Sequence, residues 1–157
     1  MFHINDIVVH PGEGVCRVAD IRNEEFQKGN PMQYYALEPL YEGGMTVFLP
    51  VDQTRVPLRS IVSAEEADTV MQRAENVDSQ WTDDERIRKE RFNTILRSGD
   101  LVMLARLILD IREQQETRRL NGKKLRSSDE FVLQETTRKV RNEIAAAKHT
   151  DPKSICI

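Results

Sequence analysis

The periodicity of the hydrophobic residues changes near residue 60, and this change constrains the fold more than any other feature. Before it, apolar and polar residues alternate in short runs such as residues 15–21, as in a strand with one buried face. After it, apolar residues recur every three or four positions, as in helices that pack on a core. The two periodicities predict an α+β protein with two domains, residues 1–62 and 63–157, and a length of 157 residues leaves room for both.

The first domain is expected to hold about five short strands joined by tight turns. Runs rich in β-branched and aromatic residues lie at 6–10, 15–21, 33–38, 45–50 and 56–59. Glycine and proline residues between them, at 11–14, 28–31 and 42–44, favour turns. Pro50 marks the end of the fourth strand because proline has no N–H for a ladder hydrogen bond. So many short strands in so little chain favour a small, strongly bent sheet or partial barrel.

The second domain is expected to be all-helical, with helices near residues 63–75, 82–97, 101–119 and 128–149. Possible capping boxes precede three of these helices, at Ser63/Glu66, Thr82/Glu85 and Ser127/Glu130. Apolar stripes predict the buried faces as Phe92, Ile95 and Leu96, then Leu101, Leu104, Ala105, Ile108 and Ile111, then Leu133, Thr136, Val140, Ile144 and Ala147. The residues after Pro152 are expected to form an ordinary tail.

Several classes of function find no support in the sequence. No apolar run approaches the roughly 18 residues that span a bilayer, and the N-terminus lacks the features of a signal peptide. Two cysteines, Cys16 and Cys156, are too few for a disulfide framework or a zinc site, so we expect a cytoplasmic protein in which Cys16 is a small core residue. Three scattered histidines and an incomplete glycine loop predict no enzyme, no metal, no cofactor and no small-molecule substrate.

The charge is distributed unevenly along the chain. Residues 1–60 hold 5 Lys and Arg against 8 Asp and Glu, whereas residues 81–157 hold 17 against 13. Only the C-terminal half is therefore suited to a polyanion. Its basic residues fall into two groups, Arg86, Arg88, Lys89 and Arg91, and then Arg118, Arg119, Lys123, Lys124 and Arg126. Either group could bind phosphates, and either could equally be a solvated helix face.

Two segments have alternative interpretations. Residues 45–49, between two glycines and Pro50, could form an edge strand that accepts a strand from another protein. The residues alone favour an internal strand with Val47 and Leu49 in the core. Trp81, the only tryptophan, could be an exposed apolar wedge for a base step in the minor groove. The residues alone favour a core anchor between helices.

The opening of the chain, Phe2-His3-Ile4-Asn5-Asp6-Ile7-Val8-Val9-His10-Pro11-Gly12-Glu13-Gly14-Val15, resembles that of CarD-like bacterial regulators, where a GD-x-V-V-Y-P-x-x-G-x-G pattern is usual. Asn5 replaces the family's glycine and His10 its tyrosine. Segments 34–37, 45–50 and 57–59 match later strands in order and spacing, and Trp81 and Ser98-Gly99-Asp100 are similar to the family's C-terminal domain. The resemblance covers about residues 1–148.

This resemblance implies a Tudor-like domain that binds the RNA polymerase β subunit, partly by strand addition at Met45, Thr46, Val47, Phe48 and Leu49. It also implies a helical domain that contacts promoter DNA at the upstream edge of the open bubble. Trp81 would be the minor-groove wedge, and the residues that would bind phosphates are Arg86, Arg88, Lys89, Arg118, Arg119, Lys123 and Lys124. Such a wedge would slow the collapse of the open complex without reading sequence. The alternative is an adaptor that binds polymerase, or another protein, without touching DNA.

Two departures from the family lie in the helical domain. Acidic residues 83–85 follow Trp81 where familiar members have a basic pair, and the second helix is roughly one turn longer. Asp129-Glu130-Phe131 stands where the start of the last helix is usually basic. Acids beside Trp81 would repel phosphates, and the positive charge lies instead in the loop at residues 118–126.

Overall fold

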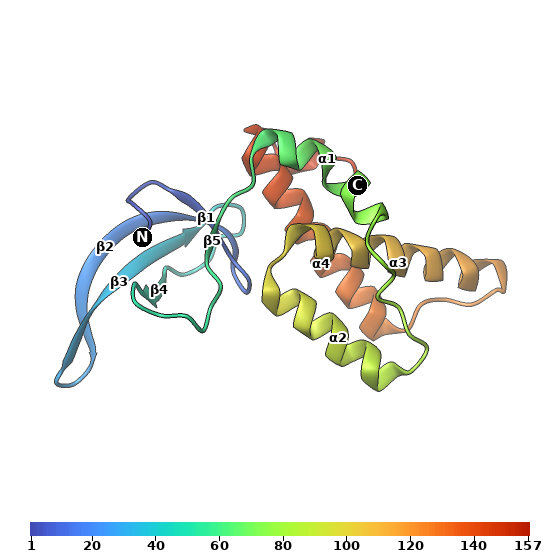
Figure 1. The fold of residues 1–157 in the computed structure, drawn as a ribbon, viewed down its shortest axis with the longest axis horizontal. Coiled ribbons are helices and arrows are strands. Elements are labelled where there is room, and N and C mark those ends of the chain that lie inside the picture. Colours follow the sequence, from blue (N-terminus) through green and yellow to red (C-terminus); the bar gives the residue numbers. More distant parts are fainter. The chain divides into compact units, whose positions relative to one another are not determined.

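The computed structural model describes all of residues 1–157 and confirms the α+β architecture (Figure 1). An antiparallel five-stranded sheet comes first and four α-helices follow. The chain divides into two compact units, Met1–Ile61 and Val62–Ile157. The strands are β1 (Ile7–His10), β2 (Gly14–Gln27), β3 (Asn30–Pro39), β4 (Val47–Pro50) and β5 (Arg59–Ser60).

The sheet has the strand order β4-β3-β2-β1-β5. Its largest feature is the β2–β3 hairpin, which Figure 1 shows as a long, curved ribbon. The hairpin extends further than expected because its tip is polar, so the hydrophobic alternation does not mark it. Register shifts between Val18 and Asp20 and between Glu24 and Gln27 accompany the bend. Gly29, with a φ of +81°, allows the tight turn at the tip.

One face of the sheet carries the core of the first unit. Val8, Cys16, Val18, Tyr35, Leu37 and Leu49 are buried there together. The expectation that Cys16 is a small core residue is confirmed, since its side chain is buried. Because strand residues alternate between the two faces, the opposite face holds the neighbours of these residues.

The two departures from the family pattern at the start of the chain have structural explanations. Asn5 has a φ of +75°, a conformation in which glycine is preferred and asparagine is among the tolerated residues. The Nδ1 atom of His10 accepts hydrogen bonds from the backbone N–H groups of Gly12 and Glu13, at 3.0 and 3.1 Å. These bonds fix the turn between β1 and β2.

The helices of the second unit are α1 (Ala64–Glu75), α2 (Glu85–Ser98), α3 (Leu101–Leu120) and α4 (Ser127–Lys148). They pack around one core, in which the predicted stripe of α3 is buried along its whole length. Phe92 and Ile95 of α2 and Val140 and Ile144 of α4 join this core. None of the helices is long and apolar enough to cross a membrane.

One of the three predicted capping boxes is present. Ser63 and Glu66 bond reciprocally at the start of α1. The prediction at Thr82 is wrong, because Asp84 is the N-cap of α2 and accepts from the N–H of Ile87. The prediction at Ser127 is also wrong: α4 begins at Ser127 itself, and its N-cap, Arg126, makes no side-chain capping bond.

The C-terminal residues are more ordered than a free tail. A short 3-10 helix, η1 (Pro152–Ser154), is followed by Ile155 and Ile157, which pack against the helical core. The carbonyl oxygen of Ile157 accepts from Arg112 at 2.6 Å, and that of Ile155 accepts from Arg141 at 3.2 Å. The expectation of an ordinary tail is therefore wrong.

Candidate functional site

Strand β4 lies at an edge of the sheet, because it pairs with β3 alone. The interpretation of an internal strand, which the residues alone favoured, is wrong in this respect. The N–H of Val51 donates to the carbonyl of Gln33, so these two residues form a hydrogen-bonded pair next to β4. In the same register Leu49 lies opposite Tyr35, and Val47 lies opposite Leu37. Since bonded residues alternate along an antiparallel strand, the N–H and C=O of Phe48 point to the open edge. The edge is thus able to accept another strand.

The two faces of β4 differ in character. Val47 and Leu49 turn inward and pack in the core of the first unit, as expected for them. Phe48 turns to the opposite face, where its ring lies 5.2 Å from Phe26 and 4.8 Å from the guanidinium of Arg22. Phe26 also packs edge-on against Tyr34, at 4.9 Å between ring centroids. We call Phe26, Tyr34 and Phe48 the outer aromatic cluster.

Phe26 was not among the residues predicted for this site. It is 56% exposed although it belongs to the cluster, so it offers apolar surface beside the open edge. The signal in the sequence is a single aromatic residue in a polar run, Asn23-Glu24-Glu25-Phe26-Gln27. The sequence alone does not predict a role for this residue, because its contact with Phe48 forms only in the folded sheet.

Met45 and Thr46 precede β4 and do not belong to it, in contrast to the expected strand bounds. Met45 is 86% exposed, the largest value among the large hydrophobic side chains. Thr46 is exposed as well. Both remain next to the open edge, where they could extend a ladder begun at Phe48.

Trp81 combines features of both interpretations that the sequence left open. Its side chain is half-buried and packs on the helical core, 6.2 Å from the ring of Phe92. The guanidinium of Arg88 lies 4.3 Å from the centroid of the indole. The indole N–H donates to Asp83 at 3.1 Å. Part of the ring therefore remains at the surface while the rest is held in place.

Arg88 does not lie on the surface, and its expected role in phosphate binding needs correction. It is 2% exposed, and its Nε and Nη2 atoms donate to the two carboxylate oxygens of Asp129, both at 3.0 Å. Its Nη1 atom donates to the carbonyl of Thr82 at 2.9 Å. All the donor groups that a phosphate would need are turned to the interior. Asp129, at a position that is usually basic in the family, is buried by the same pair.

The other basic residues of α2 are exposed but accompanied by acids. Arg86 lies 3.8 Å from Glu90, and Lys89 lies 3.4 Å from Glu85. Arg126, from the loop before α4, also bonds to Glu85, at 2.5 Å. The hydrogen bond from Lys89 and the charge of Arg126 hold the pKa of Glu85 below its ordinary value. The same contact places the α3–α4 loop beside the start of α2.

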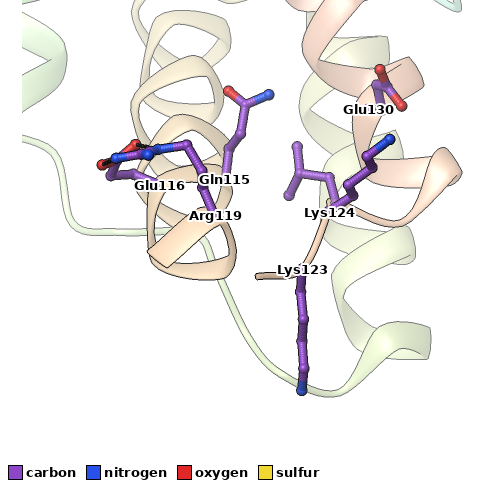
Figure 2. A pocket seen from close by; sticks show the side chains of 7 residues that line it. Gln115, Glu116, Arg119, Lys123, Lys124 and Glu130 are labelled. Atoms are coloured by element: carbon purple, nitrogen blue, oxygen red, sulfur yellow. Dashed lines mark hydrogen bonds and ion pairs between the residues drawn. The ribbon is translucent and has the colours of Figure 1, made fainter. Parts of the chain in front are cut away.

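The end of α3 and the loop after it form an open hollow of about 410 Å³, lined by Gln115, Glu116, Arg119, Lys123, Lys124, Leu125 and Glu130. Figure 2 shows Arg119 beside Glu116, whereas Lys123 points away from both helices and Lys124 points toward Glu130. Arg119 donates to Glu116 at 2.5 and 2.9 Å, which lowers the pKa of Glu116 and raises that of Arg119. Arg118 donates to the carbonyl of Lys124 at 3.5 Å. Lys123 and Lys124 are exposed, so they present their charge to solvent.

Comparison with known proteins bears on the first unit. Residues 2–62 match the family model described as the CarD-like/TRCF RID domain, a domain that interacts with RNA polymerase. No curated protein matches the sequence significantly. The matched range coincides with the β unit, including the open edge of β4. The β unit of the chain thus carries a CarD-like/TRCF RID domain, which is an RNA polymerase-interacting domain.

Proposed function

We propose that the first unit binds the β subunit of RNA polymerase by adding one of its strands to β4. The observation that carries this proposal is the open edge at Phe48, whose N–H and C=O face outward. CarD-like proteins are non-enzymatic regulators that interact with RNA polymerase. The exposed edge in this domain is therefore a surface at which polymerase could bind. Met45 and Thr46 would continue the ladder, and Val47 and Leu49 would hold the strand on its core.

The alternation of side chains predicts what the added strand presents. Its inward residues would extend the core beside Val47 and Leu49, whereas its outward residues would lie beside Phe48. The outer aromatic cluster would cover an apolar or aromatic residue there, and Phe26 would supply exposed surface at the end of the contact. The backbone bonds would give affinity, and these two faces would give specificity.

Two substitutions at one position separate backbone from side-chain contributions. Phe48→Ala removes the ring, and Phe48→Pro removes the ring and the N–H that would bond to the polymerase strand. Proline is tolerated where an edge N–H faces solvent, so the fold should persist. We expect Phe48→Ala to weaken binding of the full chain to the β subunit and Phe48→Pro to abolish it. Ile4→Ala, at an exposed apolar residue of the segment before β1, is the control and should bind normally.

Circular dichroism of each variant checks the fold, and Phe26→Ala should weaken binding as Phe48→Ala does. If Phe48→Pro binds as well as Phe48→Ala, the edge backbone makes no contact and strand addition is wrong. If all variants bind as the wild type does, polymerase is bound through another surface.

We further propose that the helical unit contacts promoter DNA at the upstream edge of the open bubble without sequence specificity and slows its collapse. Trp81 would act as a minor-groove wedge through the part of its indole that remains exposed. The residues that would bind phosphates are Arg86, Lys89, Arg118, Arg119, Lys123 and Lys124; Arg88 is left out because it is buried. The bond between Arg126 and Glu85 supports the proposal, because it brings the two basic segments into one region.

A salt titration tests the DNA proposal quantitatively. Each phosphate neutralised contributes about −0.9 to the slope of log K against log salt. Arg86, Lys89 and Arg119 form ion pairs with glutamates, so we do not count them as full phosphate contacts. The other three basic residues predict a slope of roughly −3 on upstream-fork DNA. Trp81→Ala should leave this slope unchanged but shorten the lifetime of open complexes. No binding to fork DNA, together with an unchanged lifetime for Trp81→Ala, would refute the DNA role.

A second candidate function is an adaptor that binds polymerase without DNA. The exposed carboxylate of Asp83 beside the indole favours it, as do the acids that accompany Arg86, Lys89 and Arg119. Under this alternative the fork DNA titration gives no binding at low salt, whereas the Phe48 variants still lose polymerase.

A further inference from the structure

Trp81 lies in a connection between α1 and α2, residues 76–84, that contains no helix or strand. Such a segment has to satisfy its backbone polar groups through side chains or water. Here side chains from α2 and α3 bond to it immediately before and after Trp81. The backbone on either side of Trp81 is therefore held by residues of α2 and α3.

The contacts on the N-terminal side start from Asp110 of α3, which is 1% exposed. Its carboxylate accepts from the hydroxyl of Ser79 at 2.9 Å and from the N–H of Gln80 at 2.7 Å. Arg106, one turn earlier, donates to it at 2.6 and 2.9 Å and balances its charge. The Oγ of Ser79 in turn accepts from the N–H of Trp81 at 3.2 Å. A continuous chain of hydrogen bonds thus joins α3 to the backbone of Trp81.

The contacts around the other backbone groups come from α2. Arg91 donates to the carbonyl of Gln80 at 3.0 Å, directly before Trp81. Arg88 donates to the carbonyl of Thr82 at 2.9 Å, directly after it, and stacks on the indole. Both arginines therefore hold carbonyl groups that flank the same residue.

We infer that Ser79, Asp110, Arg91 and Arg88 form a Trp81 clamp, a set of positioning residues that hold the indole in one orientation for its contact with DNA. This inference rests on the proposed DNA role. Burying ionic groups costs desolvation, and apolar residues of similar volume would join the helices equally well. What the polar set adds is a defined direction for each backbone group beside Trp81. A wedge held in advance loses less conformational freedom when it enters a base step.

The clamp can be weakened without removing its buried carboxylate. Ser79→Ala deletes the hydroxyl between Asp110 and Trp81, and Arg91→Met deletes the bond to Gln80. Ser79→Thr keeps the hydroxyl and is the conservative rescue. Thr94→Ala is the matched control, because it removes a hydroxyl that bonds only within α2, to the carbonyl of Glu90. Loss of one hydrogen bond shifts an orientation equilibrium by roughly fivefold.

Because Trp81 is the only tryptophan, its fluorescence reports on the clamp in the full chain without DNA. We expect Ser79→Ala and Arg91→Met to lower the time-resolved anisotropy of Trp81 and increase its quenching by acrylamide. Ser79→Thr and Thr94→Ala should resemble the wild type. The lifetime of the open complex should fall in Ser79→Ala and Arg91→Met, toward the lifetime in Trp81→Ala, and should stay unchanged in the other two variants. Unfolding midpoints identify any variant whose helices are disrupted.

The results distinguish failure of the Trp81 clamp from failure of the proposed DNA role. Unchanged anisotropy and quenching in Ser79→Ala and Arg91→Met would overturn the clamp. If Trp81→Ala shortens the lifetime but variants with a mobile indole do not, positioning is irrelevant to the DNA contact and the inference is wrong. If Trp81→Ala itself has no effect, the DNA role fails, and the clamp is then judged by the fluorescence alone.

Discussion

The pair of Arg88 and Asp129 gives the sharpest test of how the helical unit is stabilised. The two side chains are 3% and 4% exposed, and their two bonds join α2 to α4 across 41 residues of sequence. Arg88→Met would leave the carboxylate of Asp129 buried without its partner and the carbonyl of Thr82 without its donor. Breaking a buried pair in this way costs about 3–5 kcal/mol. This is a large share of the total stability of a domain, which is about 5–15 kcal/mol.

Urea unfolding followed by circular dichroism at 222 nm measures this loss in the helical unit. With a slope near 2 kcal/mol/M, the midpoint of Arg88→Met should fall by roughly 2 M while the slope stays unchanged. The double variant Arg88→Met/Asp129→Leu replaces both charges by apolar groups and should recover much of the loss. Lys148→Met is the control: it breaks an exposed contact with Asp68 and should cost about 0–1 kcal/mol.

The reasoning is refuted by either of two results. Arg88→Met could cost no more than Lys148→Met, which would mean that Asp129 finds water or another donor. Alternatively, the costs of Arg88→Met and Asp129→Leu could simply add in the double variant. Additivity would mean that the two residues do not act as a pair.

Three further predictions concern single residues. Asn5→Ala should destabilise the first unit by about 1–2 kcal/mol in urea unfolding because of its positive φ, whereas Asn5→Gly should cost less. Ser63→Ala should cost about 1 kcal/mol by removing the cap of α1, and Ser63→Thr should retain most of it. The carboxyl of Glu85 should titrate below its ordinary pKa of 4.5 in an NMR titration, and Arg126→Ala should raise that pKa. Since the folded pKa is lowered, the contacts of Glu85 are complete above pH 4.5 and are lost as the pH falls through the folded value.

The features that the sequence predicts well are those that a local pattern encodes. Alternation placed Cys16 and Leu49 in the core of the sheet, and the helical stripe placed Ile108 and Ile111 in the core of the helices. In both cases the period of the pattern alone decides which residues share a face. No long-range information is needed for such an assignment.

The order of the strands required long-range information that the sequence pattern lacks. Residues 47–50 have the same alternation whether one neighbour or two pair with them, so the edge position of β4 emerged only from the fold. Phe26 was missed for a related reason, because its contact with Phe48 crosses β3. The capping residues of α2 and α4 were predicted wrongly: Asp84 and not Thr82 caps α2, and no side chain caps α4.

The number of charged residues in the sequence does not predict DNA binding when many of those residues form ion pairs or capping bonds in the fold. The acids at residues 83–85 seemed unfavourable for DNA in the sequence, yet Asp84 caps α2. Asp129, at a position that is usually basic in the family, is buried against Arg88. The same burial removes one of the cations that the count assigned to DNA. What remains beside the indole is the exposed carboxylate of Asp83, whose acceptance of the indole N–H competes with any contact that DNA would make there. The balance between wedge and adaptor therefore depends on this single carboxylate and on the lysines of the α3–α4 loop, and not on the net charge of the domain.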